Sequence, residues 1–406
     1  MSNAGQLGAI CYDAETNFGE DVTTFATLRL PIKGIVDCSG LKHDKVDSGR
    51  TQQYRNEGTL YILTIQGGTF KTLLYLPGHG STTSGATTVG LVETLLGKVF
   101  GNVTASAASG TTAASGGTAS SFNTVASATF TAGGLTPVGA QGDGRGGGQF
   151  VPVATHVGTV MTPLVAIDAA PNTGDVIGSA VNIYPSETGF TVNSLRFLLQ
   201  TANLCYEAHG CYPTAVTFSG LNPGEVPMLE ITWSVAWWRY STATFPSAVA
   251  TEAFQAAANA AGSLFVNDVG TATRVKRTCR NFTLNYKLGM ESLLGPGGVN
   301  QYQAIVGARR TVDDIRIAWM EDADAATTSP VIPGFGTGTT RKHVLYTLSA
   351  ASGSRLAFYF PQVSVTTVGI QKVDKNINRI QFDGECNTGP TTTTDLTACA
   401  MRLAFA

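Results

Sequence analysis

Charge is scarce in this sequence. Asp, Glu, Lys and Arg make up 13% of the 406 residues, roughly half of the share that is usual in soluble proteins. The formal net charge of -2 excludes the basic footprint that tight nucleic-acid binding needs, although it leaves passive contact with nucleic acid open. A surface so poor in charge favours a protein that is largely covered by other copies of itself.

Cysteines are few, and long apolar runs are missing. Because the cysteines are spread out and odd in number, we expect no disulfide framework, and we expect synthesis in a reducing compartment. No stretch of about eighteen apolar residues is present, so we expect no membrane-spanning helix. The first residues also lack the basic start and apolar core of a signal peptide. The seven cysteines are Cys11, Cys38, Cys205, Cys211, Cys279, Cys386 and Cys399.

Glycine is abundant, at 47 residues, and Thr, Ala and Ser accompany it in many turn-like stretches. Apolar and polar residues alternate in many windows, as they do from Leu229 to Val235. This period of two predicts a mainly β fold. One window differs, because apolar residues recur every three or four positions up to Phe100. It predicts an amphipathic helix near residues 86–100, ended by Gly101 and Asn102.

The length favours two or three domains, and shifts in composition divide the chain. Residues 103–148 consist mainly of Ser, Thr, Ala and Gly, so we interpret them as a flexible linker or a weakly ordered insertion. Residues 59–76 predict a hairpin with its turn at Gln66-Gly67-Gly68. The expected units are an N-terminal arm (1–22), the first part of a β-domain with the helix (23–102), the low-complexity insertion (103–148), a second β-rich unit (149–270) and a C-terminal β-unit (271–406).

The stretch at residues 273–320 organises the C-terminal unit. Phe282, Leu284 and Tyr286 alternate with polar residues, and Ile315, Ile317 and Trp319 do the same further along. Between them lies Leu-Gly-Pro-Gly-Gly, which continues neither helix nor strand. We therefore predict a long hairpin, with one face on a core and the other available to a neighbouring chain.

Two charged clusters flank this hairpin. They are either a solvated surface or complementary patches on adjacent copies of one subunit. Asp313 and Asp314 are neighbours in a strand and point to opposite faces, so they do not form a catalytic carboxylate pair. The basic cluster is Arg274, Lys276, Arg277, Arg280, Arg309 and Arg310. The acidic cluster is Asp313, Asp314, Glu321, Asp322 and Asp324.

Other candidate chemistry is weak. Cys205, His209 and Cys211 lie close in sequence, but a structural zinc site needs a fourth ligand. The alternatives are a loop with buried thiols or a Cys205–Cys211 disulfide, if the geometry permits one. His79 and Ser81 follow Leu-Pro-Gly, without the nucleophile elbow of a hydrolase, so a tight turn is favoured. We expect no catalytic, cofactor or metal site.

Three stretches carry a resemblance to a known family. They are residues 45–102, which contain YRNEGTLYILTIQGGTF and end in VETLLGKVFGN; residues 195–240, from LRFLLQ to WWRY; and residues 280–325, from RNFTLNYKLG to IAWMEDADA. These patterns resemble the tail tube (major tail) proteins of long-tailed bacteriophages. The insertion at 103–148 has no counterpart in that resemblance.

The resemblance implies a tail-tube-type β-sandwich or β-barrel with a flanking helix and a second β-rich portion. It implies a structural, non-enzymatic subunit of stacked, typically hexameric rings, whose β-lined lumen conducts viral DNA from capsid to host. In such a tube the acidic cluster is expected to face the lumen, where it repels phosphate, and the basic cluster to lie between subunits. The implied partners are the terminator, tape measure and distal tail proteins, with no membrane and no cofactor. The implied location is the virion tail, after synthesis in the bacterial cytoplasm.

A second hypothesis belongs to another functional class. The chain would be a glycan-binding β-sandwich adhesin, or a tail-fibre or spike component. Trp233, Trp237 and Trp238 would then be an exposed platform on which sugar rings stack. A third hypothesis, a hydrolase that uses His79 and Ser81, has the least support in the sequence.

Overall fold

The structure of the chain is a computed structural model. It describes residues 9–22, 25, 29–30, 32, 36–45, 64–76, 90–107, 110–125, 130–139, 149–167, 170–185, 194–201, 204–222, 224–243, 245, 263–268, 276–277, 279, 281–296, 303–322, 341–348, 355–374, 377–387 and 399–406.

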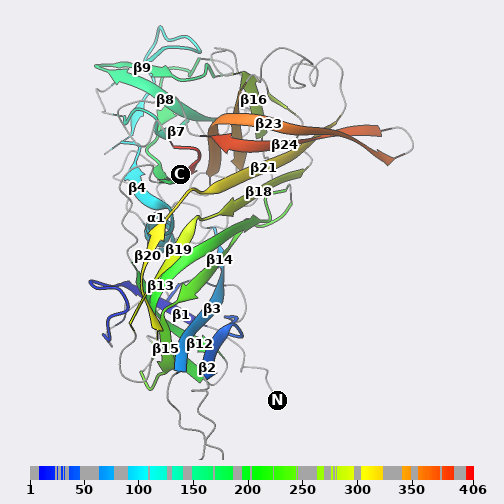
Figure 1. Cartoon of the computed structure of the whole chain (residues 1–406). Helices are drawn as coiled ribbons and strands as arrows, with labels where there is room; N and C mark the ends of the chain where they lie inside the picture. The colour runs from blue at the N-terminus through cyan, green and yellow to red at the C-terminus, as the bar shows by residue number, and fades with distance from the viewer. Residues whose placement is uncertain are drawn as a thin grey trace, which may run out of the picture.

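The described part of the chain is mainly β, as predicted, with antiparallel strands and one helix. A large curved sheet forms the body, and a smaller β unit sits at one end (Figure 1). Successive neighbours in the central part of the large sheet are β3 (Thr64–Tyr75), β14 (Met228–Val235), β13 (Leu204–Ser219), β18 (Asn281–Lys287), β21 (Asp314–Asp322), β24 (Ile377–Asn387) and β23 (Leu356–Asp374).

The sheet continues beyond both sides of this central part. On the β23 side, one path runs through β22 (Lys342–Leu348), β16 (Ser263–Asp268) and β17 (Lys276–Arg277), and another through β25 (Arg402–Phe405), β11 (Val181–Pro185) and β4 (Gly101–Ala105). On the other side, β2 (Leu41–Lys45) pairs with β3, while β12 (Leu195–Thr201) and β15 (Trp237–Tyr240) pair with β13, and β1 (Ala9–Ala14) pairs with β12.

The inner face of the large sheet and helix α1 (Leu91–Phe100) form the main core. In β18, Phe282, Leu284 and Tyr286 are buried while the residues between them are exposed, so the predicted alternation is confirmed. The apolar stripe of α1 is buried as well, which confirms the predicted helix over these residues. The helix ends where Gly101 adopts a φ of 113°, a conformation that glycine reaches without strain.

The hairpin predicted at residues 59–76 is wrong for its described part. β3 runs without a turn through Gly67 and Gly68, and Leu41 of β2 pairs with Gly68. Gly68 has a φ of 117°, and a Cβ there would lie 2.1 Å from the carbonyl oxygen of Gly40. The glycine therefore permits a close approach of two backbones within a sheet rather than a chain reversal.

The low-complexity region is folded where the structure describes it, so the interpretation as a linker is wrong there. Its strands and those that follow pair in the order β5 (Thr111–Thr112), β10 (Val176–Ile177), β7 (Leu135–Val138), β8 (Gln149–Val157), β9 (Val160–Pro163) and β6 (Phe122–Asn123). The two ends of this sheet meet, because Val125 N donates to Thr112 O at 2.9 Å and Ala114 N to Asn123 O at 2.8 Å. We call this closed unit, residues 106–180, the small barrel.

The small barrel is an insertion with its own core. Phe122, Phe130, Val151 and Met161 are among the buried residues of a cluster separate from the main core. The chain enters the barrel from β4 and leaves it into β11, and these two strands pair directly. The predicted boundary at residue 148 therefore cuts through one folded unit.

The long hairpin predicted at residues 273–320 is confirmed for its described residues, with an added bend. β18 pairs with β21, and β19 (Met290–Pro296) pairs with β20 (Gln303–Arg310) as a separate two-stranded sheet. Residues 297–302, which would form its turn, lie outside the described residues. Within the predicted N-terminal arm (residues 1–22), β1 is a strand of the large sheet.

Candidate functional site

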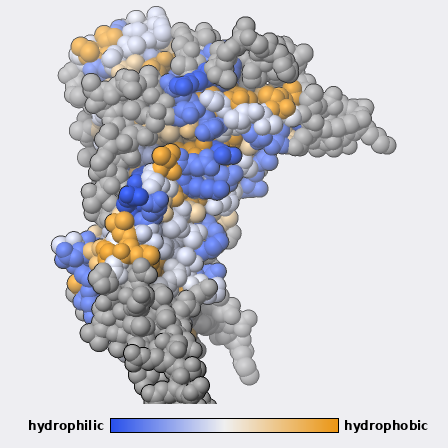
Figure 2. Space-filling view, in the orientation of Figure 1, coloured by the Kyte–Doolittle hydropathy of each residue, from blue (hydrophilic) through white to orange (hydrophobic). Residues whose placement is uncertain are grey.

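The outer face of the central strands is polar, and we call it the polar face. Short uncharged side chains and charges of both signs share it. In Figure 2 the middle of the molecule, over β18 and β21, is correspondingly hydrophilic. Residues of this face include Lys71 on β3, Glu230 and Thr232 on β14, Thr217 and Ser219 on β13, Thr283, Asn285 and Lys287 on β18, Asp314, Arg316 and Ala318 on β21, and Asp383 and Glu385 on β24.

Cations on the polar face have acidic neighbours. Lys71 Nζ lies 2.9 Å from Glu230 Oε1, and Arg316 Nε lies 2.9 Å from Asp314 Oδ1. Lys287 pairs in register with Asp314. These exposed pairs contribute little to stability, but they neutralise the local positive charge of the face.

The ribbon of β19 and β20 carries exposed apolar side chains. Leu293, Leu294 and Val306 are between 44% and 58% exposed. A Cβ on Gly295 would lie 2.9 Å from Val306 Cγ1, and a Cβ on Gly307 would lie 3.4 Å from Leu293 Cδ1. The two glycines thus leave room for Leu293 and Val306 to lie on one face of the ribbon. Figure 2 shows the resulting hydrophobic patch.

A buried polar cluster fixes the bend at the base of this ribbon. Arg310 and Asp313 form an ion pair with little exposure of either side chain. The Asp313 carboxylate accepts hydrogen bonds from the Tyr286 hydroxyl and from the backbone N of Gly289, the latter at 3.0 Å. Arg310 also donates to the carbonyl oxygen of Phe100, at the end of α1, at 2.6 Å. We call this cluster the bend lock, because it ties the ribbon to the core helix.

The predicted acidic cluster is not one surface patch. Asp313 belongs to the bend lock, and Glu321 is buried, where its carboxylate accepts a hydrogen bond from Trp319 Nε1 at 2.8 Å. Burial raises the pKa of Glu321. The expectation that these two side chains face a lumen is wrong, because both lie inside their own fold.

The remaining acidic residues are partly exposed where they are described. Asp314 pairs with Arg316 on the polar face. Asp322 Oδ1 lies 3.5 Å from Arg379 Nε of the neighbouring strand β24. Asp324 lies outside the described residues.

The predicted basic cluster is also divided. Lys276 is exposed, whereas Arg277 is buried, and burial lowers the pKa of its guanidinium. Arg309 pairs with Glu291 across the ribbon at 2.6 Å, and Arg310 belongs to the bend lock. Arg310–Asp313 is an ion pair that joins the two predicted clusters, and Arg277 also interacts electrostatically with Glu321. Arg274 and Arg280 lie outside the described residues.

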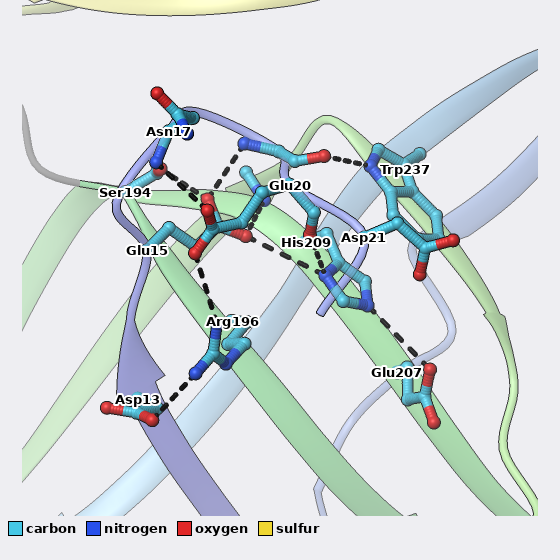
Figure 3. A network of polar contacts seen from close by, with 12 residues as sticks. Asp13, Glu15, Asn17, Glu20, Asp21, Ser194, Arg196, Glu207, His209 and Trp237 are labelled. Atoms are coloured by element: carbon cyan, nitrogen blue, oxygen red, sulfur yellow. Dashed lines mark hydrogen bonds and ion pairs between the residues drawn. The ribbon is translucent and has the colours of Figure 1, made fainter. Parts of the chain in front are cut away.

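A second polar network fastens the segment after β1, residues 15–21, which we call the strap (Figure 3). The buried carboxylate of Glu15 accepts hydrogen bonds from the Ser194 hydroxyl, from Gly19 N at 2.8 Å and from Gly210 N at 2.9 Å. Burial is the main cause that raises the pKa of Glu15. Gly210 has a φ of 61°, and a Cβ there would meet Phe18 of the strap at 3.0 Å.

Arg196 of β12 supplies positive charge beneath the strap. Its guanidinium lies 2.8 Å from Asp13 Oδ2 and 3.2 Å from Glu20 Oε1. The Glu20 carboxylate also accepts from the backbone N of Thr16 at 2.8 Å and of Asn17 at 3.2 Å. The hydrogen bond from Thr16 is the main cause that lowers the pKa of Glu20.

Arg239 of β15 holds the far end of the strap. Its guanidinium lies 2.9 Å from Asp21 Oδ1, and its Nε donates to Glu207 Oε2 at 2.6 Å. The guanidinium also lies over the ring of Trp237, 5.4 Å from the centroid. The strap is thus fixed mainly by polar contacts along its length.

His209 lies buried under the strap rather than in a metal site. Its Nδ1 donates to the carbonyl oxygen of Glu20 at 2.9 Å, and its ring stacks on Trp237 with the centroids 4.0 Å apart. Burial lowers the pKa of His209. No group of metal-binding side chains occurs in the parts of the chain that the structure describes.

The Cys205–Cys211 disulfide does not form, and all seven cysteines are free thiols. Both residues lie on the extended strand β13. Six residues of extended strand span about 20 Å, whereas a disulfide needs Cα atoms within about 7 Å.

The adhesin hypothesis predicted an exposed platform of three tryptophans, and this prediction is wrong. Trp233 and Trp238 are buried in the main core. Trp237 donates from Nε1 to the carbonyl oxygen of Gly19 at 2.9 Å and stacks on His209. None of the three rings offers an open face for a sugar.

Sequence reasoning missed the strap network, although a signal was present. Asp13, Glu15, Glu20 and Asp21 concentrate acid in a short segment of a charge-poor chain. Arg196 is the one cation in the apolar stretch Leu-Arg-Phe-Leu-Leu. A cation in such a stretch needs a carboxylate partner if the strand is buried.

We expect Glu15→Ala to lower the free energy of unfolding by about 2–3 kcal/mol, because it leaves buried donors of Ser194, Gly19 and Gly210 without an acceptor. Chemical unfolding followed by circular dichroism measures the change. Asp13→Ala is the matched control, since its side chain is 43% exposed, and it should cost less than about 1 kcal/mol. Equal effects of the two substitutions would contradict the assigned role of Glu15.

His79 and Ser81 lie outside the described residues. Within those residues, no helix combines the length and the apolar character needed to cross a bilayer. No protein-family model and no curated protein matches this chain.

Proposed function

We propose that this chain is the structural subunit of a bacteriophage tail tube, without enzymatic activity. Copies assemble into stacked rings, with six subunits per ring as the resemblance implies. The polar face lines the lumen through which viral DNA passes, and the assembled tube is part of the virion. The terminator, tape measure and distal tail proteins remain the expected partners.

The observation that carries the proposal is the exposed apolar ribbon of β19 and β20. β19 and β20 form a separate two-stranded sheet, and a two-stranded sheet needs further packing to be stable in water. Exposed apolar patches mark interaction sites. The bend lock nevertheless fixes the base of this ribbon to α1. A ribbon held in place with Leu293, Leu294 and Val306 exposed is suited to contact with another copy of the chain.

The polar face supports the proposed lumen for an electrostatic reason. Free cations hold phosphates and make binding depend on salt. Lys71 and Arg316 are each paired with a carboxylate, and Lys287 lies opposite Asp314. DNA would therefore meet hydroxyl and amide groups and neutralised charges, and it would slide without being held. In this proposal, neutralised charges on the lumen wall take the place of the expected repulsion of phosphate by Asp313 and Glu321.

Sedimentation velocity of the purified chain tests the proposal. We expect discrete assemblies at multiples of the 42.3 kDa subunit, with a population that grows with protein concentration. A single monomer boundary over the whole accessible concentration range would count against a tube subunit. The adhesin alternative has lost its proposed tryptophan platform, so no observation here favours it.

A further inference from the structure

The small barrel rests on the outer face of the large sheet along a mainly apolar contact, which we call the seam; at its edge Leu135 N donates to Asn182 Oδ1 of β11 at 2.8 Å, and Asn182 Nδ2 donates to Leu135 O at 3.2 Å. Leu135 and Phe150 of the barrel pack in one buried cluster with Phe265 of β16, Leu345 of β22 and Tyr359 of β23. All residues of β22 are buried, because the main core covers one side of the strand and the barrel covers the other. The seam therefore joins two cores that are otherwise separate.

A histidine lies in this seam. His343 is 8% exposed, and its Nδ1 is hydrogen-bonded to the Tyr359 hydroxyl at 2.9 Å. Its ring is nearly parallel to that of Tyr359, with an interplanar angle of 12°. The guanidinium of Arg402 lies over the same tyrosine ring, 5.0 Å from its centroid. His343 and a permanent cation thus share one aromatic neighbour.

A small cavity lies beside His343, and residues of both the sheet and the barrel line it. Phe265 and Asn267 of β16, Leu345 of β22 and Tyr359 of β23 line it from the sheet, and Pro152 and Val165 line it from the barrel. The charged neighbours on the sheet are Arg402 of β25 and the ion pair of Lys342 with Asp268. The barrel residues that line the cavity carry no charge.

We propose that the seam is an acid-operated latch, in which protonation of His343 releases the small barrel from the sheet while both cores stay folded. A protonated imidazole would be a second cation near Arg402 in an apolar contact. The barrel side of the cavity offers it the side chains of Pro152 and Val165, and neither side chain can stabilise a charge. Release would expose His343 to water, where the charge is solvated. This inference does not depend on assembly into a tube.

The pH range follows from the direction of the pKa shift. Burial, and secondarily Arg402, lowers the pKa of His343 from 6.5 to about 4. The docked state therefore favours the neutral imidazole. The stabilisation that neutral His343 gives to the docked state is complete above pH 6.5 and is lost as the pH falls toward 4. If release exposes His343 fully, its pKa returns from about 4 to 6.5. This difference corresponds to a change of roughly 300-fold in the equilibrium between the docked and the released barrel.

Small-angle X-ray scattering of the full chain between pH 7 and pH 4 tests the latch. Light scattering on the same samples identifies the monomer fraction, and far-ultraviolet circular dichroism reports whether the strands persist. We expect the radius of gyration of the monomer to increase below about pH 5, with the β signal retained. His343→Asn, which cannot take up a proton in this range, should abolish the increase.

Two further variants complete the test. His343→Phe keeps an aromatic ring beside Tyr359, and it serves if His343→Asn does not fold. His156→Asn changes a histidine that is hydrogen-bonded to Thr124 within the barrel, and it should leave the acid transition unchanged. A wild-type chain that stays compact to pH 4 would overturn the latch. So would expansion that persists without His343, or expansion that coincides with loss of the β signal.

Discussion

The double variant Leu293→Asp/Val306→Asp is expected to abolish assembly of the purified chain. The two side chains lie on one face of the β19–β20 ribbon, beside Gly307 and Gly295. A carboxylate buried there without a partner costs on the order of 3–5 kcal/mol. We therefore expect the concentration needed for assembly to rise by a factor of about 100 or more. Sedimentation velocity measures this concentration directly.

Val157→Asp provides the matched control. Val157 is also an exposed valine, at 75%, but it lies on the small barrel. It should leave assembly unchanged, and the monomer forms of both variants should keep the wild-type circular dichroism spectrum. Normal assembly of the ribbon variant would show that the ribbon is not part of the contacts between subunits.

Asp313→Ala is expected to destabilise the fold by about 3–5 kcal/mol, because it leaves the charge of Arg310 buried without its carboxylate partner. The substitution also removes the acceptor of Gly289 N and of the Tyr286 hydroxyl. Denaturant unfolding of the monomer measures the loss. Because the bend lock sets the direction of the ribbon, assembly should weaken as well.

A double-mutant cycle separates the ion pair from the rest of the bend lock. Arg310→Met/Asp313→Leu replaces both charges with apolar side chains and should cost less than either single truncation. Arg309→Ala breaks the exposed pair with Glu291 in the same ribbon and should cost less than about 1 kcal/mol. Additive effects at Arg310 and Asp313 would show that the two side chains are not coupled.

The alternation of the central strands and the helix could be predicted from the sequence because each has one buried face. Phe282, Leu284 and Tyr286 repeat with a period of two, and their strand has a polar outer face. The helix gave an equally clear signal, with a wide apolar stripe and Gly101 at its end. Local patterns of this kind depend on few distant contacts.

The small barrel gave no such signal. Its strands are two to nine residues long, and Ala107 and Ala113 contribute to its core beside larger residues. Its closure depends on pairing between residues 112–114 and 123–125, and small residues do not specify this pairing through alternation. Composition alone therefore favoured a linker over a folded unit.

The candidate site was partly predictable. Glu321 has the same parity as Ile315, Ile317 and Trp319 in β21, so the alternation that predicted the strand also indicated that this carboxylate is buried. The role of Asp313 could not be predicted from alternation, because the bend lock includes the carbonyl oxygen of Phe100, which is distant in sequence. No local pattern records such a contact.

Cryo-electron microscopy of the purified wild-type chain would show whether it assembles into a tube and which face lines the lumen. We expect hollow tubes or rings in which Thr217, Asn285 and Arg316 face the lumen and the β19–β20 ribbon lies between subunits. Dispersed monomers at high concentration, or tubes with these three side chains on the outer wall, would contradict this expectation.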